Sequence, residues 1–275
     1  MTTRTRRRLR LALFAALLPA MVASAAPREL NVAMLRTTAA EPPATNGERG
    51  ESSAIAELNE ALVRELCQRL AARCSQQALP FAEIIPGVES GRYQLGAGNV
   101  LRTPEREQRV LFSRPLWRSS SRLVGTPAAV RRQRAALGAG NDDEMRPQSL
   151  RGLRVAVQRG TQQHALMQRL APAQALTLVD TGTSGEALSA LLDGRAEFAL
   201  LPMRSAYFLI AGLAPGSVEF AGPALTDDGL GGSVHLILPR SEEALRRDVD
   251  AALDAMRADG TFQRIVRRHM PFLAD

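Results

Sequence analysis

Short apolar segments alternate with amphipathic helical segments along most of this chain, and this alternation restricts its fold more than any other feature. Residues 30–35, 79–81 and 95–99 are short and apolar enough for strands. Between them, apolar residues recur at helical spacing over 55–70, and a second helix is predicted at 84–90. This strand–helix–strand–helix–strand order predicts an open α/β unit with binding loops at the carboxyl ends of its strands.

A second α/β unit begins at Leu150. The elements predicted for it are, in chain order, a strand at 153–157, a helix starting at Gly160-Thr161, a strand at 176–179, a helix at 185–192 and a strand at 198–201. Beyond it, residues 234–238 are expected to form a strand and 242–258 an amphipathic helix that stops at a glycine. The polar stretches 36–51 and 127–149 lack periodicity and are interpreted as surface loops.

The first 25 residues have the three parts of a secretory signal peptide. A segment with five arginines precedes the apolar run 11–18, and Ala23-Ser24-Ala25 provides a small-x-small cleavage site. The apolar run is shorter than the roughly 20 residues that a membrane-spanning helix needs, so a retained membrane anchor is the weaker alternative. No cysteine follows closely enough for lipid attachment. We therefore expect a free protein in the periplasm of a Gram-negative cell.

The net charge depends largely on the same segment. The chain carries a formal charge of +7 at pH 7, and loss of the five arginines leaves about +2. The remaining basic residues are interleaved with acidic ones, so we do not expect the nucleic-acid partner that a strongly basic domain would indicate. The remaining length of about 250 residues suits two lobes of ordinary domain size.

Cys67 and Cys74 are the only cysteines, an even number in an oxidising compartment. One continuous helix would hold them about 10 Å apart, too far for a disulfide. If they pair, the helix must therefore end near Arg73 and the chain must turn back. Two free buried thiols are the alternative. The three histidines show no zinc-ligand spacing, so no metal site and no cofactor are expected.

A candidate anion-binding arginine follows a helix start at Thr103. Thr103 suits a helix N-cap, Pro104 the first helical position, and Glu105 the positive end of the helix dipole. Arg106 then has a fixed scaffold, and its planar guanidinium can bind a carboxylate through two parallel hydrogen bonds. The alternative is an ordinary solvated arginine.

The segment around this arginine resembles a known family. Residues 87–124 read GVESGRYQLGAGNVLRTPEREQRVLFSRPLWRSSSRLV, and residues 255–269 read AMRADGTFQRIVRRH. Both are similar to polar amino acid solute-binding proteins of the periplasm (bacterial solute-binding family 3). The Cys-x6-Cys spacing resembles the lysine/arginine/ornithine- and histidine-binding members. The resemblance extends in order over essentially the whole mature chain.

The resemblance implies a two-lobed periplasmic binding protein-like fold of type II. Two open α/β lobes would be joined by a two-stranded hinge, with chain crossings near 122–124 and 223–229. After the signal peptide at 1–25, lobe one would comprise residues 26–121 and 229–275, and lobe two residues 122–228.

The resemblance also implies which residues bind the ligand between the lobes. The arginine of the T-x-x-R turn, here Arg106, would bind a carboxylate together with backbone N–H groups of the helix after Gly160-Thr161. Phe81 lies where the family often has an aromatic wall; core packing is the alternative for it, and simple helix capping is the alternative for Thr161. The further positions that complete the predicted ligand site are Thr38, Asn99, Leu101 and Gln162.

The chain departs from the family pattern where amino acid binders often carry acidic residues. Residues 35–38 read LRTT, and residues 201–203 read LPM in place of a strand that usually ends in an aspartate for the ligand's α-ammonium. An unpaired ammonium in a closed cleft is costly. Arg36, Arg102 and Arg106 could instead create a more anionic site. A carboxylate-rich ligand is therefore a candidate beside an amino acid-like one.

The function expected from the resemblance is capture of a small polar or anionic ligand and its delivery to an ABC transporter permease, by a monomer that performs no bond chemistry. Two alternatives remain. One is an orphan periplasmic protein with a sensing or accessory binding role. The other is an enzyme on the same fold, similar to cyclohexadienyl dehydratases, which would need a general acid beside the anion site. No obvious candidate for that acid is found in the sequence.

Overall fold

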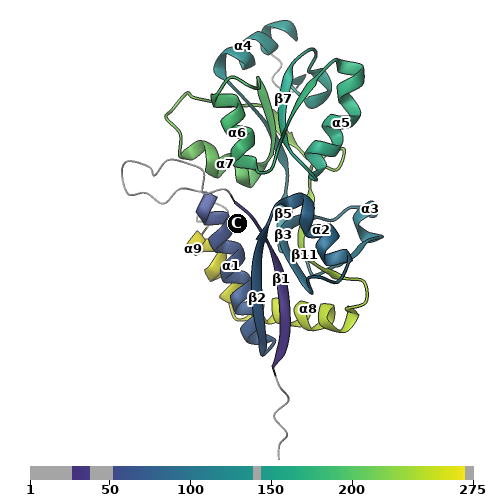
Figure 1. Cartoon of the computed structure of the whole chain (residues 1–275). Helices are drawn as coiled ribbons and strands as arrows, with labels where there is room; N and C mark the ends of the chain where they lie inside the picture. The colour runs from purple at the N-terminus through teal and green to yellow at the C-terminus, as the bar shows by residue number, and fades with distance from the viewer. Residues whose placement is uncertain (1–26, 38–51, 139–143, 270–275) are drawn as a thin grey trace, which may run out of the picture.

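The structure of the chain, a computed structural model, describes residues 27–37, 52–138 and 144–269. It contains two β-sheets, each with helices packed on it, and the chain passes twice between them (Figure 1). The two-lobed α/β fold predicted from the sequence is confirmed. The predicted signal peptide and most of the predicted loop at 36–51 lie outside the described residues.

The first sheet has the strand order β2-β1-β3-β11-β4, and β5 also pairs with β11. Its strands are β1 (Arg28–Leu35), β2 (Ala72–Leu79), β3 (Leu95–Leu101), β4 (Val110–Phe112), β5 (Trp117–Ser119) and β11 (Gly232–Pro239). The helices of this lobe are α1 (Ser52–Arg69), α2 (Phe81–Glu89), α3 (Pro104–Glu107), α8 (Glu243–Ala258) and α9 (Thr261–His269). Strand β1 runs parallel to β2 and β3, whereas β11 is antiparallel to β3.

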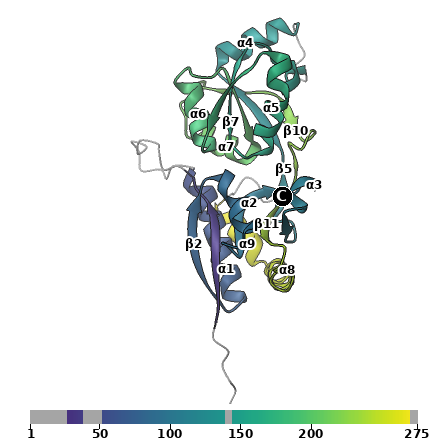
Figure 2. The same ribbon diagram turned by 45° about the vertical axis from the view of Figure 1, so that its right-hand side comes forward.

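The second sheet has the strand order β10-β6-β9-β7-β8. Its strands are β6 (Ser121–Gly125), β7 (Arg154–Gln158), β8 (Thr177–Thr181), β9 (Phe198–Pro202) and β10 (Glu219–Leu225). The helical elements of this lobe are α4 (Pro127–Ala136), η2 (Pro147–Ser149), α5 (Gln162–Gln174), α6 (Ser184–Leu192) and α7 (Met203–Ala211). In the view of Figure 2 these helices surround β7 in the upper lobe.

The chain passes between the sheets at Ser120, which separates β5 from β6, and again over residues 226–231 between β10 and β11. A buried hydrogen bond joins the two passages, because the Ser121 hydroxyl donates to the Leu230 carbonyl at 2.6 Å. The Gln163 amide of α5 in turn donates to the Ser121 hydroxyl at 2.8 Å. The predicted lobe boundaries at 121/122 and 228/229 lie close to these passages, and we retain them as a proposal.

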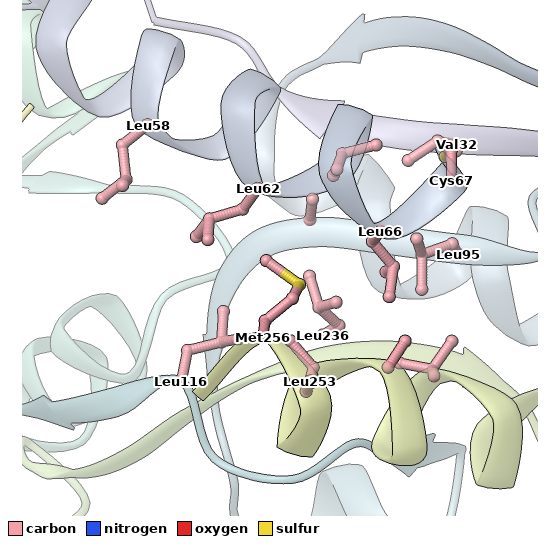
Figure 3. Packing of buried hydrophobic residues seen from close by; sticks show 14 of the residues in the cluster. Val32, Leu58, Leu62, Leu66, Cys67, Leu95, Leu116, Leu236, Leu253 and Met256 are labelled. Atoms are coloured by element: carbon pink, nitrogen blue, oxygen red, sulfur yellow. The ribbon is translucent and has the colours of Figure 1, made fainter. Parts of the chain in front are cut away.

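The core of the first lobe explains the helical spacing of leucines in the sequence. Leu58, Leu62 and Leu66 of α1 lie on the side of the helix that faces Leu253 and Met256 of α8 (Figure 3). All five side chains are buried. Folding of this lobe therefore buries apolar side chains of α1, α8 and the sheet in one core. This burial is the main driving force for forming the lobe.

The predicted reversal of the chain between the two cysteines is confirmed, but the helix ends earlier than the predicted position near Arg73. The helix ends at Arg69, and β2 begins at Ala72. Ala71 between them has a φ of 48°. This left-handed conformation reverses the chain within two residues, so Cys74 lies in a strand instead of at the end of the helix.

The predicted strand at 79–81 is also wrong in its bounds, because β2 ends at Leu79 and Phe81 is the first residue of α2. Pro80 separates the two elements. Proline has no N–H with which to continue a strand ladder, and here it occupies the N-cap position of α2.

The prediction of a surface loop over 127–149 is wrong for its first half, where α4 forms. The Thr126 hydroxyl caps this helix by accepting from the Ala129 N–H, and Pro127 occupies its first turn. Val130 is fully buried in the core of the second lobe. The arginines of α4 led us to interpret this segment as a solvated loop, despite the capping threonine and the proline at its start.

Two further helices were not predicted. Helix α7 follows β9 directly, and α9 follows α8 after the turn at Gly260. Both are only nine residues long. At this length the helical periodicity covers only about two and a half turns and is a weak signal.

The predicted disulfide is confirmed: Cys67 of α1 is bonded to Cys74 of β2 with the Cα atoms 6.3 Å apart. Closing so short a loop reduces the entropy of the unfolded chain only moderately. We therefore expect Cys67→Ala combined with Cys74→Ala to lower the free energy of unfolding by roughly 2–3 kcal/mol, measured by urea denaturation. Wild-type protein in reductant should show the same loss, and equal stability of all three samples would contradict the prediction.

Candidate functional site

A cleft between the two lobes brings together residues from both sheets. It encloses about 670 Å³ of empty space, including the part open to solvent. The first lobe contributes residues at or near the ends of β1, β3 and β5, and the second lobe contributes the starts of α5, α6 and α7. The carboxyl ends of strands β1, β3, β7 and β9 meet here, which is the usual place for a binding site in an open α/β sheet.

Arg106 lies at this cleft with a side chain that is buried although it carries a charge. The residue is 6% exposed. Its guanidinium donates to the Leu101 carbonyl at 2.9 Å and, across the lobes, to the Gly160 carbonyl at 3.1 Å. Burial lowers the pKa of Arg106 to about 10, so the side chain is still a cation at neutral pH. Of the five N–H donors of a guanidinium, these carbonyls use two, and an anion can take others.

The local sequence around Arg106 holds this side chain in place. The Thr103 hydroxyl accepts from the Arg106 N–H as the N-cap of α3. The guanidinium carbon lies 5.6 Å from the centre of the Phe81 ring, within range of a cation–π interaction. Phe81 is buried among core residues and also lines the cleft, so its core packing is present and its role as an aromatic wall for a ligand stays a prediction.

Asn99 reaches the cleft through a distortion of β3. Between the pairs Val100–His235 and Gly96–Ile237 the register of β3 against β11 shifts. Asn99 adopts a φ of 55° there, a geometry typical of strand bulges near binding sites. Its Oδ1 is buried and has no hydrogen-bond partner. A neutral polar group is thus available to a ligand at this position.

Thr161 and Gly160 form the opposite wall. The Thr161 hydroxyl accepts from the His164 N–H as the N-cap of α5, so its capping role is present. Gly160 has a φ of 78°, and a Cβ added to it would lie 2.8 Å from the Cα of Ala82 in α2. The two lobes are therefore in direct contact at Gly160.

The structure brings most of the sequence-predicted positions together. Those that line the cleft are Phe81, Asn99, Leu101, Arg106, Thr161 and Gln162. Gly160 borders it through its contacts with Arg106 and Ala82. Thr38 lies outside the described residues. Their roles in binding a ligand remain predictions.

Two arginines that the sequence suggested for this site do not line the cleft. Arg36 is exposed and donates to the Ala78 carbonyl at 3.4 Å. Arg102 is exposed and forms an ion pair with Glu107. Both alternate along the chain with residues that do line the cleft, Leu35 and Leu101. Each arginine is the first residue after its strand, and its side chain contacts a group outside the cleft lining.

Arg204 lines the cleft, although it was not predicted from the sequence as a site residue. It is the second residue of α7. Its guanidinium carbon lies 4.9 Å from the centre of the Trp117 ring, which belongs to β5 in the first lobe. Burial lowers the pKa of Arg204. The other cleft residues missed include Gln158, Ser184 and Ser205. Gln158, Arg204 and Ser205 could have been found from their positions just at or after the carboxyl ends of predicted strands.

The described residues that line the cleft include no aspartate or glutamate. Leu35 and Pro202, which occupy positions where the sequence comparison suggested acids, both lie at the cleft. In the described ranges there is no group of three or more His, Cys, Asp or Glu side chains that could hold a metal ion. None of the helices described is long and apolar enough to cross a membrane.

The family model of the bacterial extracellular solute-binding proteins, family 3, matches residues 55–272. This chain belongs to that family. The histidine-binding periplasmic protein of Salmonella typhimurium is 26% identical to this chain over 214 residues, 77% of each. The lysine/arginine/ornithine-binding periplasmic protein of Escherichia coli K12 is 24% identical over 213 residues, again 77% of each. The family resemblance seen in the sequence is confirmed.

Solved structures share the fold of this family 3 protein. An ancestral arginine-binding protein bound to arginine superposes with a TM-score of 0.71 at 20% identity, over 88% of this chain and 98% of that one. An ancestral amino acid-binding protein that is a precursor of cyclohexadienyl dehydratase gives a TM-score of 0.64 at 18% identity, over 87% and 94%. At these identities the likeness concerns the fold alone.

Proposed function

We propose that this protein captures a small carboxylate-bearing ligand between its two lobes and delivers it to an ABC importer in the membrane, without bond chemistry. The observation that carries the proposal is the buried Arg106, which lies at the interlobe cleft with hydrogen bonds to carbonyls of both lobes. A carboxylate bound there would meet a guanidinium cation and the N-terminal end of α5. Closure of two lobes around a ligand is a common mechanism of binding proteins.

The named relatives support this solute-binding function. The histidine-binding and the lysine/arginine/ornithine-binding proteins are both periplasmic. The described cleft lining also contains no carboxyl or imidazole group that could act as a general acid, which favours binding over a dehydratase-like reaction.

A thermal-shift screen of residues 26–275 with amino acids, dicarboxylates and small inorganic anions tests the proposal. A ligand that binds only the folded protein stabilises it by RT ln(1 + [L]/Kd), about 2.7 kcal/mol at a hundredfold excess over Kd. We expect at least one carboxylate to raise the melting temperature. Absence of any shift from every carboxylate at millimolar concentration would contradict the proposed ligand class.

Delivery to an importer needs a second test. Deleting the gene for this protein from its host should abolish high-affinity uptake of the radiolabelled compound found in the screen, and the intact gene should restore it. Unchanged uptake would favour the alternative of an accessory or sensing protein.

We also propose that the protein is periplasmic and that the mature chain begins at Ala26. Ala25 ends the small-x-small site, so cleavage should follow it. Intact-mass measurement of periplasmic material from an expressing Gram-negative host should give residues 26–275, two hydrogens lighter because of the disulfide. Detection of the arginine-rich segment in the secreted product would contradict this prediction.

A further inference from the structure

The cleft contains two cationic side chains that come from different lobes. Arg106 belongs to α3 in the first lobe, and Arg204 belongs to α7 in the second. Each stacks on an aromatic ring of the first lobe, Arg106 on Phe81 at 5.6 Å and Arg204 on Trp117 at 4.9 Å. The attraction of a cation to the face of an aromatic ring helps to hold both guanidinium groups at the cleft.

The other polar groups of the cleft are neutral. They are the amides of Asn99, Gln158, Gln162 and Gln163 and the hydroxyls of Ser119, Thr161, Ser184 and Ser205. No carboxylate occurs among the described lining residues. An anionic group entering this cleft finds opposite charge at two places. An ammonium group would lose its water without gaining an anionic partner from these residues, which is costly in a closed site.

Both arginines contact the opposite lobe. Arg106 already connects the lobes through the Gly160 carbonyl, and Arg204 connects them through Trp117. A ligand with an anionic group at each end could bind both guanidinium groups at once, and so add attraction between the lobes in the closed state. A ligand with one anionic group can engage only one of them.

We propose that Arg106 and Arg204 are two separate anion-binding positions, so that the preferred ligand is a small molecule with two anionic groups and no ammonium, as in a short dicarboxylate. This inference rests on the proposed function, because it assumes that the interlobe cleft is the ligand site. It narrows the ligand class from carboxylates in general to dianions.

Isothermal titration calorimetry of residues 26–275 tests the inference with matched probes. Succinate and glutarate carry two carboxylates, butyrate carries one, and glutamate is glutarate with an added α-ammonium. Arginine and histidine represent the ligands named for relatives. We expect succinate or glutarate to bind at least about tenfold more tightly than each of the other probes.

The variant Arg204→Gln should separate the two positions. It removes one charge but keeps a polar side chain, so dicarboxylate affinity should fall about tenfold or more while butyrate affinity changes less than about threefold. Arg118→Gln is the matched control, because Arg118 is an exposed arginine of β5 outside the cleft lining, and it should leave both affinities nearly unchanged. Thermal melts verify folding, and Arg204→Lys, which keeps the charge, should retain the preference for dicarboxylates.

The possible results distinguish this inference from the function on which it rests. Tighter binding of glutamate, arginine or histidine than of both dicarboxylates would overturn the inference and leave a carboxylate-binding protein. Equal losses for butyrate and dicarboxylates in Arg204→Gln, or no loss for either, would overturn the second anion position. Failure of every probe would count against both the inference and the proposed ligand class.

Discussion

Replacing Arg106 by alanine is expected to weaken ligand binding by a factor of about 30 or more. The guanidinium is buried, and it is held by the Thr103 cap and by the carbonyls of Leu101 and Gly160. A bound carboxylate would lose its buried charge-assisted partner, at a cost of about 2–5 kcal/mol. Calorimetric titration with the compound that gives the largest thermal shift measures the loss.

Arg109→Ala is the matched control for this experiment. Arg109 follows α3 in sequence, but it is exposed and its Nε donates to Glu89 at 3.0 Å on the surface. Exposed ion pairs of this kind contribute little, so the affinity should change less than about threefold. If folded Arg106→Ala binds as tightly as the wild type, Arg106 is not the ligand anchor.

Replacing Gly160 by alanine is expected to weaken binding about 10- to 100-fold by obstructing closure of the lobes. The added Cβ would lie 2.8 Å from the Cα of Ala82 in the opposite lobe, and backbone cannot move aside as a flexible side chain can. Overlaps of this kind cost about 1–3 kcal/mol. The clash exists only when the lobes meet, so the penalty should appear in ligand affinity, measured by calorimetry with the same compound.

The conformational strain of the substitution needs its own control, because Gly160 has a positive φ. Gly152 lies in the same lobe with a φ of 62°, and an added Cβ there meets nothing within 4 Å. Gly152→Ala should therefore lose similar stability in a thermal melt but bind ligand as the wild type does. Equal affinity losses in the two variants would attribute the effect to strain within the lobe instead of contact between the lobes.

Some features of this protein followed from local sequence. Leu58, Leu62 and Leu66 repeat at helical spacing and indeed pack on the first sheet. Thr103, Pro104 and Arg106 indicated a capped helix start with a basic side chain, and that helix is present. Such signals are readable because they depend on residues within one or two turns of each other.

Other features depended on residues far apart in the chain. Arg36 and Arg102 are cations like Arg106, but both are exposed and lie outside the cleft lining, and Arg204 contributes the second charge instead. Arg204 and Trp117 belong to different lobes, so their contact depends on how the two lobes are arranged in the folded protein. The spacing of residues along the chain therefore predicted several of the helices and strands, and it placed Arg106 at a capped helix start. The charge balance of the cleft was decided by tertiary structure, because burial and orientation select which of the many arginines a ligand can reach.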